Sequence, residues 1–378
     1  MMEYWNIGLS SRIVLDLQTP AHHAIKFRPD SVIHHSRVQT PIIPIFQHSL
    51  WVKGRQRTRP RVSFQSMKSA LQNFIGLAVT VSILLGGQLA PAGAADTTLA
   101  GQTSGVLLSS PKVTNGNPLL VQIDTRKLKP PITAMELIFQ ERQFPVYRHP
   151  VNAAHYRFGL IAIPFRNAPG PAKLTLKWTN ATGEHVRTIP FEIIAGKYRT
   201  DVLKVDPARV NPSKKNIQRS KKEARKVKQT YAKGSIAGLW DGDFQLPMAS
   251  EITSPFGNKR LFNGQLKSYH NGVDFRAPIG TPVFAANSGV VKMAENLFYS
   301  GDVVIIDHGN LIFTIYAHLS KIEVTAGQQI EKGQQLGLTG ASGRVSGPHL
   351  HWGVKVNGAA VNPIQLVKVM ASLIKEQE

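Results

Sequence analysis

The sequence contains no cysteine, which excludes disulfides, thiolate zinc sites and cysteine nucleophiles. Long hydrophobic runs are also scarce: the apolar stretch Ile75–Leu85 is shorter than the roughly 20 residues that cross a membrane. The chain has 378 residues, of which 42% are apolar and 18% charged. It can therefore bury a sizeable core and has room for two or three domains.

Acidic residues are few, 23 against 45 lysines and arginines, so the formal net charge is +22. Residues 1–66 carry +6, residues 67–95 carry +1 and residues 96–234 carry +15, whereas residues 235–378 contain eleven residues of each sign. A basic surface attracts phosphate groups. No basic motif interleaved with aromatic residues accompanies this charge, so nucleic-acid binding is not predicted.

Residues 67–95 have the three-part pattern of a secretory signal peptide. A short basic start at Met67 precedes the apolar run, and Pro91–Ala95 supplies the small residues of a cleavage site. We therefore expect an exported protein of the periplasm or cell envelope, attached to a membrane only if this segment remains uncleaved. Because residues 1–66 come first, we hypothesise that they are a leader of doubtful translation; the alternative is a genuine basic pre-sequence.

Residues 96–200 alternate short apolar runs with turn signals, which is typical of a small β-sandwich, with an immunoglobulin-like fold as one version. The segment 173–178 alternates strictly between polar and apolar residues, as a half-buried strand does. No catalytic constellation is visible here, so an accessory domain is predicted. The other strand-like segments are 119–123, 135–139, 158–163 and 191–194.

Residues 201–238 are predicted to form a basic helical linker. Ser213 is a suitable N-cap and Gly234 a suitable stop, and residues 213–233 hold nine Lys/Arg and a single acid, Glu223. A narrow apolar stripe recurs at helical spacing in Ile217, Ala224, Val227 and Tyr231. We expect a solvated connecting helix. The alternatives are a basic arm near an acidic polymer or membrane surface, and a lid over the next domain.

Residues 239–378 are predicted to form a compact all-β domain with no long amphipathic helix before the last dozen residues. Five polar side chains in it are candidates for chemistry. His270 and Asp274 have H-x-x-x-D spacing, His349 and His351 have H-x-H spacing, and His318 follows an apolar strand. Positions i and i+2 of a strand face the same way, so the H-x-H pair would enter one cleft. Histidine and carboxylate are good zinc ligands, and three such ligands leave one position open for catalysis.

Three stretches together resemble the lysostaphin/LytM-type zinc metallopeptidases, which cut peptide bonds in peptidoglycan. These are Ser268–Phe275 (SYHNGVDF), Tyr316–Ser320 (YAHLS) and Ser346–Gly353 (SGPHLHWG). The resemblance covers about residues 250–365 and implies a duplicated hybrid motif of β-strands. It implies one Zn²⁺ held by three residues, with two more histidines lining the site. The implied ligands are His270, Asp274 and His351, and the implied catalytic histidines are His318 and His349.

By this resemblance, the zinc would lower the pKa of a water and polarise the scissile carbonyl. One of His318 and His349 would pass the water's proton to the leaving amine, and the other would hydrogen-bond the oxyanion; the sequence does not assign the two roles. His308 is interpreted as a turn residue.

The sequence thus predicts a mainly β enzyme, a zinc metalloendopeptidase acting on peptidoglycan cross-links. A D,D-endopeptidase cutting D-Ala–diaminopimelate is favoured, and cleavage of glycine bridges is the alternative bond. The alternative function is a LytM-like regulator that activates another wall hydrolase. Envelope or cell-division regulators are further candidate partners.

Overall fold

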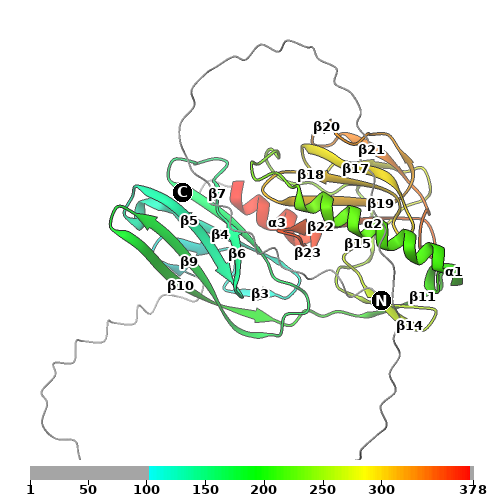
Figure 1. Ribbon diagram of the computed structural model, residues 1–378, viewed down its shortest axis with the longest axis horizontal. Coiled ribbons are helices and arrows are strands. Elements are labelled where there is room, and N and C mark those ends of the chain that lie inside the picture. Colours follow the sequence, from blue (N-terminus) through cyan, green and yellow to red (C-terminus); the bar gives the residue numbers. More distant parts are fainter. Residues whose placement is uncertain (1–101, 375–378) are drawn as a thin grey trace, which may run out of the picture. The chain divides into compact units, whose positions relative to one another are not determined.

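The computed structural model describes residues 102–374, which lie within one compact unit (Figure 1). The predicted leader 1–66 and signal peptide 67–95 fall outside the described residues. Within the described residues, no helix is both long and apolar enough to cross a membrane. Strands dominate the chain, so the predicted mainly β fold class is confirmed.

The first hundred described residues form two five-stranded sheets that face each other across a core. One sheet has the order β1-β2-β4-β8-β7 and the other the order β3-β10-β9-β5-β6. The strands of the first sheet are β1 Gln102–Thr103, β2 Val106–Leu108, β4 Pro118–Asp124, β8 Tyr156–Ala162 and β7 Tyr147–Arg148. Those of the second are β3 Lys112–Thr114, β10 Gly183–Ile194, β9 Gly170–Asn180, β5 Ile132–Phe139 and β6 Arg142–Pro145, and a 3₁₀ turn spans Thr125–Leu128.

The alternation in the sequence explains which side chains fill this core. Leu174, Leu176 and Trp178 on β9 are buried, and the residues between them are half-buried. Strand β4, in contrast, is a nearly continuous run of apolar residues, because side chains pack against both of its faces. Its Leu119 packs into the sandwich core, whereas Leu120 belongs to the core of the second half of the chain.

The basic segment contains a strand as well as helices. β11 (Thr200–Leu203) pairs in parallel with β13 (Lys259–Phe262), which pairs in turn with β14 (Gln265–Tyr269). α1 (Pro207–Val210) and α2 (Lys214–Ala232) follow, and the backbone N–H of Asn216 donates to Ser213 Oγ over 3.3 Å, as the predicted N-cap requires. β11 was not predicted, because its four residues show no distinctive pattern.

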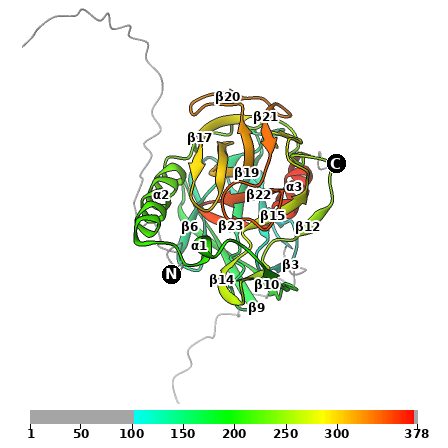
Figure 2. The same cartoon turned by 90° about the vertical axis from the view of Figure 1, so that its right-hand side faces the viewer.

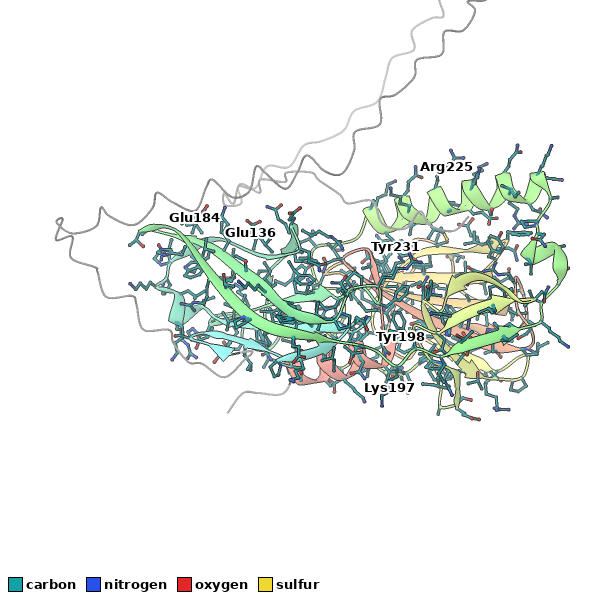
Figure 3. All side chains as sticks on the ribbon, turned by 90° about the horizontal axis from the view of Figure 1, so that it is seen from below. Glu136, Glu184, Lys197, Tyr198, Arg225 and Tyr231 are labelled. Atoms are coloured by element: carbon teal, nitrogen blue, oxygen red, sulfur yellow. The ribbon has the colours of Figure 1, made fainter. Side chains whose placement is uncertain are left out.

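α2 has no buried residue, as expected of a solvated connecting helix, but one of its faces packs on the strands. Tyr231 meets the Phe313 ring edge-on with centroids 5.1 Å apart, and Val227 joins the same cluster. Lys226 Nζ lies 2.6 Å from Glu295 Oε2. Figure 3 shows Arg225 on the outer side of the helix and Tyr231 on the side toward the strands.

The second half of the chain is a sheet of ten strands in the order β12-β15-β22-β19-β18-β17-β20, with β23 beside β22, β21 beside β19 and β16 beside β21. The outer strands are β12 Ile252–Ser254, β16 Pro282–Phe284, β20 Gln329–Ile330, β21 Gln335–Thr339 and β23 Ala359–Val361. The central strands are β15 Gly272–Arg276, β22 His349–Val356, β19 Ile312–Ile322, β18 Gly301–Asp307 and β17 Gly289–Leu297, and α3 (Pro363–Ile374) ends the described chain.

The central strands have one core face and one face that carries the polar site. Leu350, Trp352 and Val354 of β22 are fully buried in the main core, which also receives α3. His349 and His351 alternate with them and therefore lie on the other face. Helix α2 packs on this second face, over β17 to β19, and Figure 2 shows α2 and α3 on opposite sides of the strands.

His308 lies between β18 and β19, as the turn interpretation expected, but its ring is completely buried. It is held by the Ser288 carbonyl and the Thr314 hydroxyl, each 2.7 Å away. Burial lowers the pKa of His308 from 6.5 to about 4, because the charged ring would lose its hydration.

This histidine makes the fold sensitive to acid. The unfolded chain takes up the proton near pH 6.5, so the folded state loses stability as the pH falls from 6.5 to about 4. The loss reaches about 3 kcal/mol, from 1.36 kcal/mol per pKa unit. Urea unfolding at pH 7 and pH 4.5 should show that His308→Gln loses about 2 kcal/mol less than the wild type over this interval. Equal losses would contradict the assignment.

Candidate active site

Three potential metal ligands meet at the edge where β14, β15 and β22 come together. His270 directly follows β14, Asp274 lies on β15, and His351 lies on β22 directly opposite Asp274 in the strand register. His270 Nε2 is 2.9 Å from Asp274 Oδ1 and 3.1 Å from His351 Nδ1, which is itself 2.9 Å from the same carboxylate oxygen. The three predicted ligands thus converge on one point.

The backbone fixes the orientation of His270. Its Nδ1 lies 2.8 Å from the Pro255 carbonyl oxygen, which can only accept a hydrogen bond, so the proton is on Nδ1. The lone pair of Nε2 therefore points at Asp274 and His351, as a metal ligand requires. Gly272 allows His351 to lie close beside it, because a Cβ there would be 2.4 Å from the Trp352 carbonyl oxygen and 2.8 Å from His351 Cε1.

The spacing of these donor atoms fits zinc. Tetrahedral bonds of about 2.0–2.1 Å place neighbouring ligand atoms about 3.3 Å apart. The observed separations of 2.9 to 3.1 Å are a few tenths of an ångström smaller, so the ligands need only small movements. Two imidazoles and a carboxylate, with no thiolate, are a donor set that suits a catalytic Zn²⁺.

His318 and His349 stand beside this cluster. Their ring centroids are 4.9 Å apart, and the His318 ring is 6.0 Å from that of His351. Nδ1 of His318 donates to the Ser342 carbonyl and Nδ1 of His349 to the Gly347 carbonyl, each over 2.8 Å. Both rings therefore leave Nε2 as a free acceptor. His349 Nε2 is buried without a hydrogen-bond partner and lies 3.8 Å from Asp274 Oδ1.

A β-bulge turns His318 toward the site. On β19, Ala317 faces His351 across the register, so simple alternation would place His318 on the core face. The pairing with β18 runs from Val304 opposite Tyr316 to Asp302 opposite Leu319, which leaves one extra residue in β19. His318 takes a left-handed φ of 65° at this point. Bulges of this kind re-aim side chains next to active sites.

Burial and charge set the protonation of four of these side chains, Asp274 and three of the histidines. Burial lowers the pKa of His270 to about 4, and it also lowers the pKa of His318 and of His349. For Asp274, burial acts to raise the pKa, but contacts with His270, His351 and Arg260 outweigh it and hold the pKa well below its usual range. At neutral pH the site thus combines the Asp274 carboxylate with neutral imidazoles at His270, His318 and His349, which can bind a metal or accept protons.

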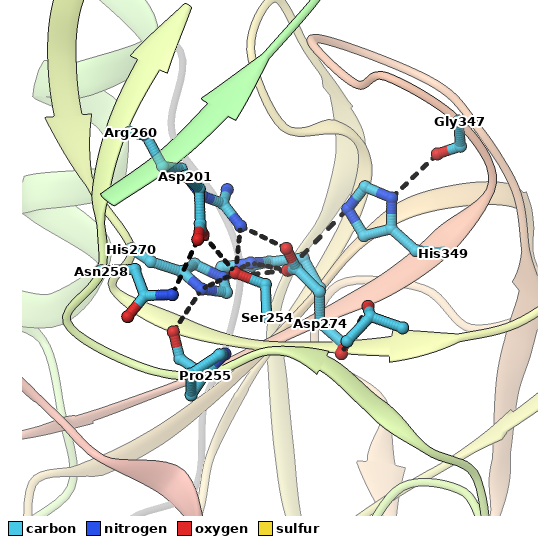
Figure 4. A network of polar contacts seen from close by, with 11 residues as sticks. Asp201, Ser254, Pro255, Asn258, Arg260, His270, Asp274, Gly347 and His349 are labelled. Carbon is cyan, nitrogen blue, oxygen red and sulfur yellow. Dashed lines mark hydrogen bonds and ion pairs between the residues drawn. The ribbon is translucent and has the colours of Figure 1, made fainter. Parts of the chain in front are cut away.

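Sequence reasoning missed a group of supporting residues, drawn in Figure 4. The Arg260 guanidinium donates to Asp274 Oδ2, which leaves Oδ1 for the metal. Asp201 on β11 accepts from Ser254 Oγ over 2.8 Å and from Asn258 Nδ2 over 2.9 Å, and Ser254 Oγ lies 3.1 Å from His270 Nδ1. These residues are scattered along the sequence without a common spacing, so no pattern could have found them.

The Arg260–Asp274 ion pair should contribute strongly to stability. Its side chains are 14% and 8% exposed, so Arg260→Gln would leave a buried carboxylate without its cation. We expect the free energy of unfolding of the metal-free protein to fall by about 3 kcal/mol. The matched control is Arg276→Gln, which removes the pair with Glu251 whose side chains are 69% and 67% exposed. It should change stability by less than about 0.5 kcal/mol in the same denaturation assay. Similar losses in both variants would refute this.

Three convergent metal ligands beside two histidines in a β-rich domain are an arrangement typical of mononuclear metallohydrolases. Residues 268–363 match the model of peptidase family M23, a LytM-type family of zinc-dependent peptidases.

Among curated proteins, the chain is 50% identical over 128 residues to the peptidoglycan DD-endopeptidase ShyA of Vibrio cholerae, covering 34% of this chain and 30% of that protein. It is 38% identical over 117 residues to the DD-carboxypeptidase/endopeptidase Mpg of Neisseria meningitidis, covering 31% and 27%. The chain thus spans less than a third of the length of these relatives.

A crystal structure of a candidate M23 peptidase from Pseudomonas aeruginosa is also similar. It has 28% identity and a TM-score of 0.52, and the match covers 69% of this chain and 96% of that one. This coverage is much wider than residues 268–363, so the structural likeness extends beyond the peptidase domain.

Proposed function

We propose that this protein is a zinc metalloendopeptidase that hydrolyses peptide cross-links of peptidoglycan, as a D,D-endopeptidase. The observation that carries the proposal is the convergence of His270, Asp274 and His351 beside two histidines whose Nε2 atoms are free acceptors. The names of the relatives, which act on peptidoglycan as DD-peptidases, support the same substrate.

In this proposal each side chain has a separate task. His270, Asp274 and His351 hold Zn²⁺, which when bound acts as a Lewis acid on the scissile carbonyl and activates a water. One of the Nε2 atoms of His318 and His349 takes the proton of the attacking water and delivers it to the leaving amine. The other would take up a proton from solvent on its Nε2 and, as an imidazolium, donate a hydrogen bond to the oxygen on which negative charge develops. The carbonyls of Ser342 and Gly347 hold Nδ1 of each ring protonated, so Nε2 is the atom that gains and loses protons.

The LytM-like regulator is the weaker candidate, because such domains characteristically lack zinc ligands and this chain has all three in contact. Turbidity clearing of purified peptidoglycan separates the two functions. The proposal expects clearing by the protein alone, its loss in chelator and its return on addition of zinc. Clearing only when another hydrolase is present would favour the regulator.

We also propose that the protein acts in the periplasm or cell envelope, where its substrate is found. The signal-like pattern of residues 67–95 supports this location. Envelope or cell-division regulators remain predicted partners. N-terminal sequencing of the protein recovered from the envelope would test export, and a new N-terminus close to residue 95 is the expected result.

A further inference from the structure

Arg344 lies in the loop between β21 and β22, just ahead of the two histidines of the H-x-H motif. Its guanidinium is sandwiched between two aromatic rings, 4.2 Å from the centroid of Phe262 and 4.4 Å from that of Tyr299. Phe262 comes from β13 and Tyr299 from the turn between β17 and β18. The loop therefore bridges two elements that are distant in the sequence.

The guanidinium has no anionic partner. Among the described residues, no carboxylate, carbonyl or hydroxyl forms a hydrogen bond or ion pair with it; only the backbone N–H of Arg344 is bonded, to the Tyr299 carbonyl over 2.8 Å. Burial lowers the pKa of Arg344 to about 10, so the side chain is still a cation at neutral pH. The centroids of the two rings lie within 4.4 Å of the guanidinium carbon, and its N–H groups, which have no acceptor among the described residues, can bind a ligand.

Two connections place this cation beside the reacting groups. Ser342, two residues earlier, accepts the hydrogen bond that orients His318. On the other side, Phe262 lies on β13 together with Arg260, whose guanidinium donates to the metal ligand Asp274. The positive charge of Arg260 also lowers the pKa of Arg344. Gly343 allows the loop to lie this close, because it has a φ of +82° and a Cβ there would be 2.4 Å from the Gly301 nitrogen.

We propose that Arg344 binds a carboxylate of the substrate next to the scissile bond, and so selects peptides whose amine-donating residue carries a free α-carboxylate. The proposal rests on the proposed function and specifies its substrate. A D-Ala–diaminopimelate cross-link has such a carboxylate on the carbon that bears the scissile nitrogen. A glycine bridge does not, because each of its residues continues into a further amide.

The geometry suits this task. A guanidinium packed against two aromatic rings presents a planar fork of N–H groups that matches both oxygens of a carboxylate. Because the rings already restrict its rotamers, little conformational entropy is lost when the ligand binds. The lack of a protein carboxylate means that the substrate need not displace an internal partner.

The test uses two synthetic cross-linked peptides that differ only in this group, which is a carboxylate in one and a carboxamide in the other. For the wild type, kcat/KM should favour the carboxylate by about 10- to 100-fold, as expected for a charge-assisted hydrogen bond. Arg344→Gln should remove this preference, slowing cleavage of the carboxylate peptide and leaving the carboxamide peptide little changed. Arg276→Gln, an equal change of charge on β15, should keep the preference.

A binding measurement separates this proposal from the proposed function. Calorimetry with the zinc-loaded His318→Ala protein should show the same preference for the carboxylate peptide, lost when Arg344→Gln is added. If the wild type cleaves neither peptide but this binding preference is found, the proposed function fails and the role of Arg344 stands. If both peptides are cleaved or bound equally well by the wild type, or Arg344→Gln weakens both to the same extent, the role of Arg344 is overturned. Arg344→Lys, which keeps the charge without the fork, should give an intermediate preference and serves if the glutamine variant does not fold.

Discussion

Asp274→Asn is expected to abolish both zinc binding and hydrolysis. Its Oδ1 lies 2.9 Å from a nitrogen of each of the other two ligands, so it is the single anion at their centre. An amide of the same shape cannot supply that charge. Loss of the metal removes several kcal/mol of transition-state stabilisation, which corresponds to a fall in kcat/KM on the order of 10³-fold or more.

The measurement pairs zinc content, by mass spectrometry of the purified protein, with the rate of peptidoglycan hydrolysis. Asp241→Asn is the matched control, because it makes the same chemical change at an exposed residue outside the site. It should retain zinc and activity. An Asp274→Asn protein that keeps one zinc and normal activity would show that the metal centre has been assigned to the wrong residues.

His318→Ala is expected to separate metal binding from catalysis. The ring centroid of His318 is 6.0 Å from that of His351, and its Nδ1 is occupied by the Ser342 carbonyl, so it is placed to move protons rather than to hold the metal. Zinc content should be unchanged, whereas kcat should fall by about 10²- to 10⁴-fold, the usual contribution of a general acid–base group.

The pH profile adds a readout that a purely structural role would not affect. If His318 is the base, the acidic limb of the kcat/KM profile should disappear in His318→Ala and persist in His349→Ala; the reverse would assign the base to His349. His155→Ala, an exposed histidine in the N-terminal sandwich, should leave both zinc and rate unchanged. A fully active His318→Ala enzyme would exclude a catalytic role for this residue.

Local patterns predicted the parts of the site that lie on regular strands. The H-x-H spacing placed His349 and His351 on one face of β22, because alternation has a period of two residues. His270 and Asp274, which their H-x-x-x-D spacing had made candidates, meet in the same cleft, with His270 Nε2 2.9 Å from Asp274 Oδ1. His318 was a candidate because it follows an apolar strand, but its orientation could not be predicted, because it depends on a bulge that alternation does not anticipate.

The positions of the supporting residues depend on pairing between strands that are distant in the sequence, so local sequence patterns could not predict them. β11 reaches the site only through its parallel pairing with β13, which brings Asp201 opposite Arg260 although 59 positions separate them. The sequence showed the basic charge of α2, but it did not predict that the helix packs on the strands, because the apolar stripe through Val227 and Tyr231 is narrow. Only the fold shows that these two side chains pack against Phe313.

Among the described residues, no hydrogen bond or ion pair joins α2 to the five site residues, which gives the lid alternative no support.

The central claim is that the zinc centre cuts the peptide cross-links of peptidoglycan. Mass analysis of muropeptides released from purified peptidoglycan, with and without chelator, tests it most directly. We predict that cross-linked D-Ala–diaminopimelate dimers are converted to monomers, that chelator stops the conversion, and that added zinc restores it. Dimers that persist with the zinc-loaded protein, or a conversion that chelator does not affect, would contradict it.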